Sequence, residues 1–173
     1  MPSEEKMAQA VEKYLGHKNC LTAREVPLDG CRLDVVAYDK TRRVFRVVEC
    51  KDTSRAPSIG KAFGQLAAYF GMVSSHGHDF VDAASKKLTM RYGRWMEATE
   101  GGKRIHVEFY VCLPDEACRR VELMQGLKKM LPHVGIIRFT MKGHCRNNIW
   151  VKSRRDSKLA EARRRIVRVK HHH

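Results

Sequence analysis

The chain has 173 residues, 43% of them hydrophobic, which is enough for one domain with a buried core. It contains no apolar run long enough to cross a membrane and no apolar leader near Met1, so we expect a cytoplasmic protein that does not enter membranes. Its 34 Lys and Arg residues against 19 Asp and Glu residues leave a net charge of +15, which favours a polyanionic partner such as nucleic acid.

The first predicted element is a helix that begins after Ser3, a residue type that caps helix N-termini well. At about 100° per residue, Glu4 falls near the centre of the apolar stripe of this helix, whereas Glu5 and Glu12 fall to its sides. The stripe consists of Met7, Ala8, Val11, Tyr14 and Leu15. Glu4 therefore lies nearest the face that packs on the core, although acids in a first turn also simply complement the helix dipole.

Two consecutive apolar runs, 33–38 and 44–51, read as buried strands but carry charges. Asp34 lies in the first run, and Glu49 and Lys51 lie in the second. An unpaired charge in a buried strand is costly, so something must compensate these three side chains.

The polar stretch 39–42 between the runs suits a tight hairpin turn. Because side chains alternate along a strand, Glu49 and Lys51 share one face and the Cys50 side chain points to the other. Asp34 joins them if it pairs opposite Glu49 or opposite the residue two before it. The two carboxylates would then be close enough for one cation to bridge them.

These residue types predict a hydrolytic metal site. Carboxylate oxygens without a His or Cys cluster suit Mg²⁺ or Mn²⁺ better than zinc. We expect Asp34, Glu49 and the backbone carbonyl of Cys50 to hold the metal. Lys51 would orient or deprotonate the attacking water, with its pKa lowered by the metal and by burial, or would neutralise charge on the phosphorus transition state. The chemistry is phosphodiester hydrolysis.

The rest of the chain alternates helical and extended patterns. The predicted elements are a helix at 58–75, an irregular segment at 76–103 with a short helix near 82–87, a strand at 105–113, a helix at 114–131 and a strand at 135–141. This order favours an α/β fold with a central mixed sheet flanked by helices on both faces.

Residues 142–170 form a basic extension, with eleven Lys and Arg against two acids. Apolar residues in 157–169 are spaced as one helical face, so we expect the extension to be partly helical. It is either a solvated tail or, as we favour, a nucleic-acid contact. The arginines expected to make that contact are Arg154, Arg155, Arg163, Arg164 and Arg165. Residues 171–173 look like the remnant of a purification tag.

Asp34, followed on the next strand by Glu49-Cys50-Lys51, resembles the motif of the PD-(D/E)XK nuclease superfamily, which has the restriction-endonuclease-like fold. Gln65 and Tyr69 on the following helix fit the Q-x-x-x-Y motif of its RecB-like branch. The proline that usually precedes the first acid is absent. The resemblance implies a nuclease-like domain over 1–141, built on a restriction-endonuclease-like sheet.

The resemblance also implies roles for individual residues. Gln65 joins the catalytic group, and so does the first-helix acid, for which Glu4 is our choice and Glu5 the second. Gln65 and Tyr69 share one helical face, which could reach the active site or the DNA; we expect Tyr69 and Lys61 to contact DNA.

The implied activity is that of a metal-dependent deoxyribonuclease, with endonucleolytic cleavage favoured over exonucleolytic cleavage. Because many nucleases of this fold pair to cut both strands, a homodimer is one expected form. Two alternatives stay open: an inactive nucleic-acid-binding module on the same fold, and an RNA-processing nuclease.

Overall fold

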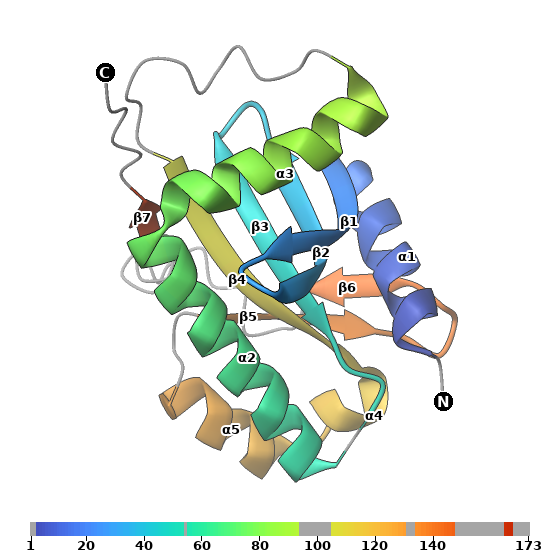
Figure 1. Cartoon of the computed structure of the whole chain (residues 1–173). Coiled ribbons are helices and arrows are strands. Elements are labelled where there is room, and N and C mark those ends of the chain that lie inside the picture. The colour runs from blue at the N-terminus through green and yellow to red at the C-terminus, as the bar shows by residue number, and fades with distance from the viewer. Residues whose placement is uncertain (1–2, 54, 94–104, 131–133, 148–164, 168–173) are drawn as a thin grey trace.

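The computed structural model describes residues 3–53, 55–93, 105–130, 134–147 and 165–167 (Figure 1). Its helices are α1 (Glu4–Gly16), α2 (Ala56–Ser75), α3 (Gly77–Tyr92), α4 (Asp115–Cys118) and α5 (Val121–Met130). Its strands are β1 (Cys20–Leu28), β2 (Cys31–Asp39), β3 (Val44–Cys50), β4 (Ile105–Pro114), β5 (Val134–Phe139), β6 (Cys145–Asn147) and β7 (Arg165–Val167).

The strands of the described ranges form one mixed sheet in the order β1-β2-β3-β4-β5-β6, with β7 also paired to β4. Strands β1, β2 and β3 are antiparallel to one another, whereas β3, β4 and β5 run parallel. Strand β6 is antiparallel to β5, and β7 is antiparallel to β4. The predicted central mixed sheet is confirmed.

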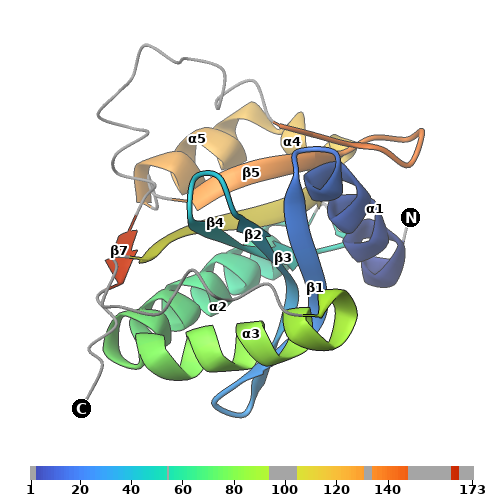
Figure 2. The same cartoon turned by 90° about the horizontal axis from the view of Figure 1, so that it is seen from above.

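Helices cover both faces of this sheet, as predicted. On one face, Met7 and Val11 of α1 pack in the same core as Val35 and Val48 of the hairpin strands. Helices α2 and α3 cover the other face, where a second core includes Phe45 of β3. Figure 2 shows α2 and α3 lying together along one side of the sheet. None of these helices combines the length and apolar character that a membrane span needs.

The predicted β2–β3 hairpin is confirmed. Asp39 closes its turn, because its Oδ1 accepts hydrogen bonds from the backbone N–H groups of Thr41 and Arg42, each at 3.0 Å. The ladder then runs from the Asp39–Val44 pair to the Val35–Val48 pair.

Strand β1 was not predicted, and its residues explain why. Ala23, Val26 and Leu28 pack in the same core. Side chains on one face of a regular strand are an even number of residues apart, but Ala23 and Val26 are three residues apart. Between them, Glu25 has a left-handed φ of 51°, which changes the face to which the following side chains point. The simple alternation expected of a strand is therefore broken.

Two helices also differ from expectation. Residues 77–92 form one continuous helix rather than an irregular segment, with Phe80, Val81, Ala84 and Leu88 buried at helical spacing. The helix predicted over 114–131 is divided into α4 and α5 around residues 119 and 120.

The sheet continues beyond residue 141, where we placed the end of the nuclease-like domain. Strand β6 pairs with β5, and β7 pairs with β4. The helix expected over 157–169 is wrong at residues 165–167, which are extended because they pair with β4; the remainder of that expected helix lies outside the described residues.

Candidate active site

The strands β2 and β3 part immediately after the Val35–Val48 pair, and the acids follow at that point. Continuing the register would place Asp34 opposite Glu49, one of the two pairings expected. Instead, Oδ2 of Asp34 accepts the backbone N–H of Cys50 at 2.7 Å, a donor that a strand carbonyl would accept if the ladder continued. The carboxylate of Asp34 therefore lies in the fork between the strands.

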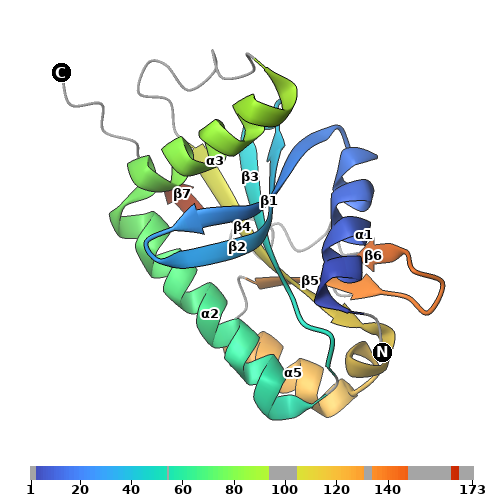
Figure 3. The same ribbon diagram turned by 45° about the vertical axis from the view of Figure 1, so that its right-hand side comes forward.

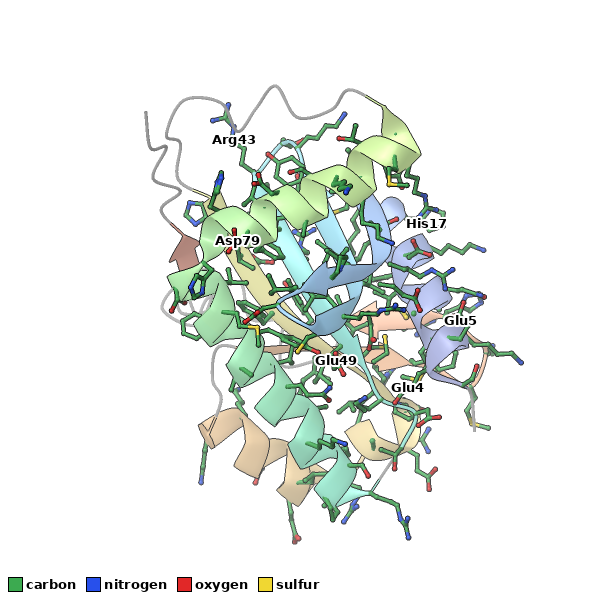
Figure 4. The ribbon with its side chains drawn as sticks, in the orientation of Figure 1. Glu4, Glu5, His17, Arg43, Glu49 and Asp79 are labelled. Atoms are coloured by element: carbon green, nitrogen blue, oxygen red, sulfur yellow. The ribbon has the colours of Figure 1, made fainter. Side chains whose placement is uncertain are left out.

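Lys51, the residue after β3, pairs with one carboxylate of β3 and one carboxylate of α1. Its Nζ lies 3.2 Å from Oε1 of Glu49 and 3.3 Å from Oε1 of Glu4. Figure 4 shows Glu49 at the end of β3 and Glu4 beside it at the start of α1. Glu5 points away and pairs with Arg24. The structure thus selects Glu4 over Glu5 as the first-helix acid of this site.

Cys50 takes the orientation that strand alternation predicts. Its side chain is fully buried in the core beneath α1, whereas Glu49 reaches Tyr69 of α2 on the opposite face. The sulfur is therefore not part of the site, and Cys50 contributes to it only through its backbone.

Tyr69 contacts the second carboxylate oxygen of Glu49. Its hydroxyl lies 3.5 Å from Oε2 of Glu49 and also 3.5 Å from the backbone carbonyl of Arg32. Because Tyr69 is only 3% exposed, it faces the carboxylate rather than solvent, and the DNA contact that we expected of it is not available in this arrangement. Its position makes it a support for Glu49.

The site carries a surplus of negative charge. Among the residues that the structure describes, Glu4, Asp34 and Glu49 provide three carboxylates against the ammonium of Lys51. Burial, followed by the charge of Asp34, raises the pKa of Glu49 to about 7. Burial also raises the pKa of Asp34, although its hydrogen bond from Cys50 acts in the opposite direction. A bound cation would favour the charged forms of Asp34 and Glu49 and so lower the pKa of both.

In the metal-free protein the pKa of Lys51 is raised above its ordinary value. Burial by itself lowers it, but the charges of Glu49 and Glu4 and the hydrogen bonds to them more than offset burial, so the net pKa is raised. Lys51 is therefore an ammonium at neutral pH in the metal-free protein.

The donor set fits a hard cation held by few protein ligands. No group of three or more His, Cys, Asp and Glu side chains in the described ranges is arranged to hold a metal. Asp34 nevertheless has one carboxylate oxygen, Oδ1, with no hydrogen-bond donor among the described residues. Mg²⁺ commonly binds through one or two carboxylates and completes its shell with water and substrate phosphate, so Asp34 and Glu49 suffice.

Comparisons with known proteins add a fold likeness. No family model matches the chain, and no curated protein matches its sequence. The chain is similar in structure to a FdxN element excision controlling factor protein from Anabaena variabilis, with a TM-score of 0.52 and 12% identity over 82% of this chain and 96% of that chain. At this identity the likeness concerns the fold alone.

Gln65 lies one helical turn before Tyr69, on the same side of α2. Its Oε1 is buried, and no described residue donates a hydrogen bond to it. A buried acceptor without a donor is costly, so this oxygen is suited to a bound water or ligand.

The structure describes only some of the residues expected to bind DNA. Lys61 is exposed on α2, whereas Arg154, Arg155, Arg163 and Arg164 lie outside the described residues. Arg165 pairs with Val107 in β4, which in turn pairs with Phe45. Its backbone is thus about four residues, or about 13 Å, along the strands from the level of Glu49.

Sequence reasoning placed Tyr69 on a helix face that could reach the active site or the DNA, but it did not predict the contact with Glu49. The signal was present, because Tyr69 follows Leu66 and Phe63 on the buried face of α2 rather than on its exposed face. The contact itself depends on how α2 crosses the sheet, which local spacing does not specify.

Proposed function

We propose that the chain is a metal-dependent deoxyribonuclease of the PD-(D/E)XK kind, with endonucleolytic cleavage favoured. The observation that carries this proposal is the position of the Asp34 carboxylate in the β2–β3 fork, bonded to the N–H that follows Glu49. A plain hairpin needs no acid there. Here Asp34 accepts a backbone N–H that a strand carbonyl would otherwise accept, and it does so beside the buried carboxylate of Glu49 and the ammonium of Lys51. Such a group of charged side chains can support phosphodiester hydrolysis.

Asp34, Glu49 and the Cys50 carbonyl would hold Mg²⁺ or Mn²⁺. When bound, such an ion lowers the pKa of a water ligand and offsets charge on the phosphate oxygens. Tyr69 restrains one oxygen of Glu49, so the carboxylate is oriented before substrate arrives. Gln65 offers its buried oxygen to a water on the α2 side.

Lys51 acts as a cation in this scheme. We assign it to orienting the attacking water and stabilising transition-state charge on the phosphate, because its ammonium lies within hydrogen-bond distance of Glu49 and Glu4. Glu4 holds the Lys51 ammonium from the helix side at 3.3 Å and so acts as a positioning residue.

The decisive assay is cleavage of supercoiled plasmid and of single-stranded DNA with Mg²⁺ or Mn²⁺. We expect Asp34→Asn and Lys51→Met each to lower the rate about a hundredfold or more. Asp29→Asn is the matched control, because Asp29 is an exposed acid in the β1–β2 turn, and it should keep wild-type activity. Conversion of closed circles to nicked circles would identify an endonuclease.

Metal binding is measured separately, by titrating Mn²⁺ and following the free-ion spin-resonance signal. Wild type and Asp29→Asn should bind the ion, and Asp34→Asn should lose most of that binding. If wild type binds DNA but is as inert as its variants, the chain is a binding module. Faster cleavage of RNA than of DNA in parallel reactions would identify an RNA-processing nuclease.

A further inference from the structure

A short turn between β5 and β6 exposes a large apolar side chain. Met141 in this turn is 94% exposed. Figure 3 shows the β5–β6 hairpin projecting beside α1. Covering this side chain with a partner would remove its apolar surface from water, which is favourable.

The turn is held in one shape by its own hydrogen bonds. The N–H of Thr140 donates to the carbonyl of His144 at 2.8 Å, and the N–H of Gly143 donates to the carbonyl of Thr140 at 2.9 Å. Gly143 has a φ of 75°, which a residue with a side chain rarely adopts. These bonds fix the position from which Met141 projects.

The bases of the hairpin are anchored in the core beneath α1. Phe139, immediately before the turn, and Cys145, immediately after it, are each 8% exposed and belong to the core cluster that includes Met7 and Val11. The exposed methionine is therefore carried on a supported hairpin rather than on a free loop.

Strand register places this turn at the same end of the sheet as the candidate active site. Cys50 pairs with Cys112, and Cys112 pairs with Ile137, so parallel β5 leaves the sheet beside the end of β3. Glu49 pairs with Val111, and Val111 pairs with Ile136, so Met141 is about two strands, or about 10 Å, across from Glu49 and about five residues, or about 17 Å, farther along. The separation is about 20 Å.

The surroundings of Met141 are positive. Lys142, His144 and Arg146 are exposed, and residues 140–146 contain no acid. This combination attracts a phosphate backbone and presents an apolar group at the same place.

We infer that Met141 is a wedge that inserts at a base step of duplex DNA, with Lys142 on the adjacent phosphates; the duplex substrate rests on the proposed function. Apolar side chains partly unstack a step and kink the helix when they are inserted in this way. At about 3.4 Å per base pair, a separation of about 20 Å places the opened step about six base pairs from the phosphate at Asp34 and Glu49. Flexible pyrimidine–purine steps are the preferred sites.

The test uses the full chain in EDTA, so that no cleavage intervenes, and duplexes that carry 2-aminopurine at a TA step. Wild type should increase the fluorescence of the probe, because unstacking relieves quenching. Met141→Ala should abolish the increase and weaken binding about tenfold to a hundredfold, and Met141→Leu should restore both. Lys142→Ala should weaken binding to all duplexes alike and reduce the salt dependence by about one charge.

Met90→Ala is the matched control. Met90 is 79% exposed near the end of α3, and its neighbour Arg91 pairs with Glu12 in the C-terminal half of α1, away from Glu4. This variant should behave as wild type. An equal loss in Met90→Ala and Met141→Ala, or no loss in Met141→Ala, overturns the wedge.

The inference and the nuclease proposal fail separately. A wild-type fluorescence change that depends on Met141 supports the wedge even if Mg²⁺ and Mn²⁺ yield no cleavage. If cleavage occurs, a duplex with one TA step should be cut about six base pairs from that step by wild type and at scattered positions by Met141→Ala. Cleavage positions that Met141→Ala leaves unchanged would overturn the wedge while leaving the nuclease intact.

Discussion

Replacing Glu49 by Gln tests the electrostatic character of the site without any substrate. Burial, and then the charge of Asp34, raises the pKa of Glu49 from 4.5 to about 7 in the folded chain. The folded protein therefore holds a proton more tightly than the unfolded chain. The stability contributed by that proton is fully present below the unfolded pKa of 4.5 and is lost as the pH rises through about 7.

The size of the Glu49 pKa shift sets how much folding stability is lost as the pH rises. At about 1.4 kcal/mol per pKa unit, the metal-free wild type should lose about 2 to 3 kcal/mol between pH 5 and pH 8 through this group. The raised pKa of Asp34 acts in the same direction. The raised pKa of Lys51 adds no slope there, because Lys51 stays protonated throughout this range. Glu49→Gln should be the more stable protein at pH 8 and should show a flatter pH profile.

The assay is urea unfolding at pH 5, 6, 7 and 8 in EDTA. Glu122→Gln is the control, because Glu122 is exposed in the first turn of α5 and should keep the wild-type profile. Adding Mn²⁺ at pH 8 should stabilise wild type and leave Glu49→Gln unchanged, since an ion that binds only the folded state raises its stability. Equal pH slopes for wild type and Glu49→Gln would refute the account of Glu49 as a buried, strained carboxylate.

Three further substitutions have defined outcomes. Tyr69→Phe removes the hydroxyl 3.5 Å from Glu49, so folding should change by about 1 kcal/mol or less while Mn²⁺ affinity falls severalfold, as measured by urea unfolding and ion titration. Gly135→Ala would place a Cβ 2.4 Å from Cδ1 of Tyr110, and this clash should lower the free energy of unfolding by about 1 to 3 kcal/mol. In a Tyr110→Ala background the same substitution should cost nothing, and a cost that persists there would exclude the clash as the cause. Arg46→Met removes the guanidinium that pairs with the buried carboxylates of Asp39 and Glu108 and should cost about 3 to 5 kcal/mol in urea unfolding at pH 7, whereas a loss below 1 kcal/mol would show that this ion network is dispensable.

Much of the candidate site could be read from local patterns. Glu49 and Lys51 share a face because they are two residues apart in a strand, and the polar turn closed by Asp39 makes the hairpin with Asp34 predictable. The apolar stripe of α1 placed Glu4 nearest the core side, where the structure finds it beside Lys51. Each of these relations depends on residues within one element or across one short turn.

The remaining features depend on pairings that local spacing does not encode. Local spacing did not predict β1, because the left-handed backbone at Glu25 reverses the alternation of its side chains between the two faces. Strand β7 pairs with β4, which lies about sixty residues earlier in the chain. Tyr69 reaches Glu49 because α2 crosses the sheet at one particular angle.

The amino-acid order by itself determined which charged residues lie on the two hairpin strands and on the first helix, because strand and helix periods act over a few residues. The tertiary structure alone decided that the strands part at Asp34, that a tyrosine supports the second carboxylate, and that the β5–β6 turn leaves the sheet at the same end as Lys51. These outcomes arise from packing between distant segments, in which each segment's position depends on all of the others.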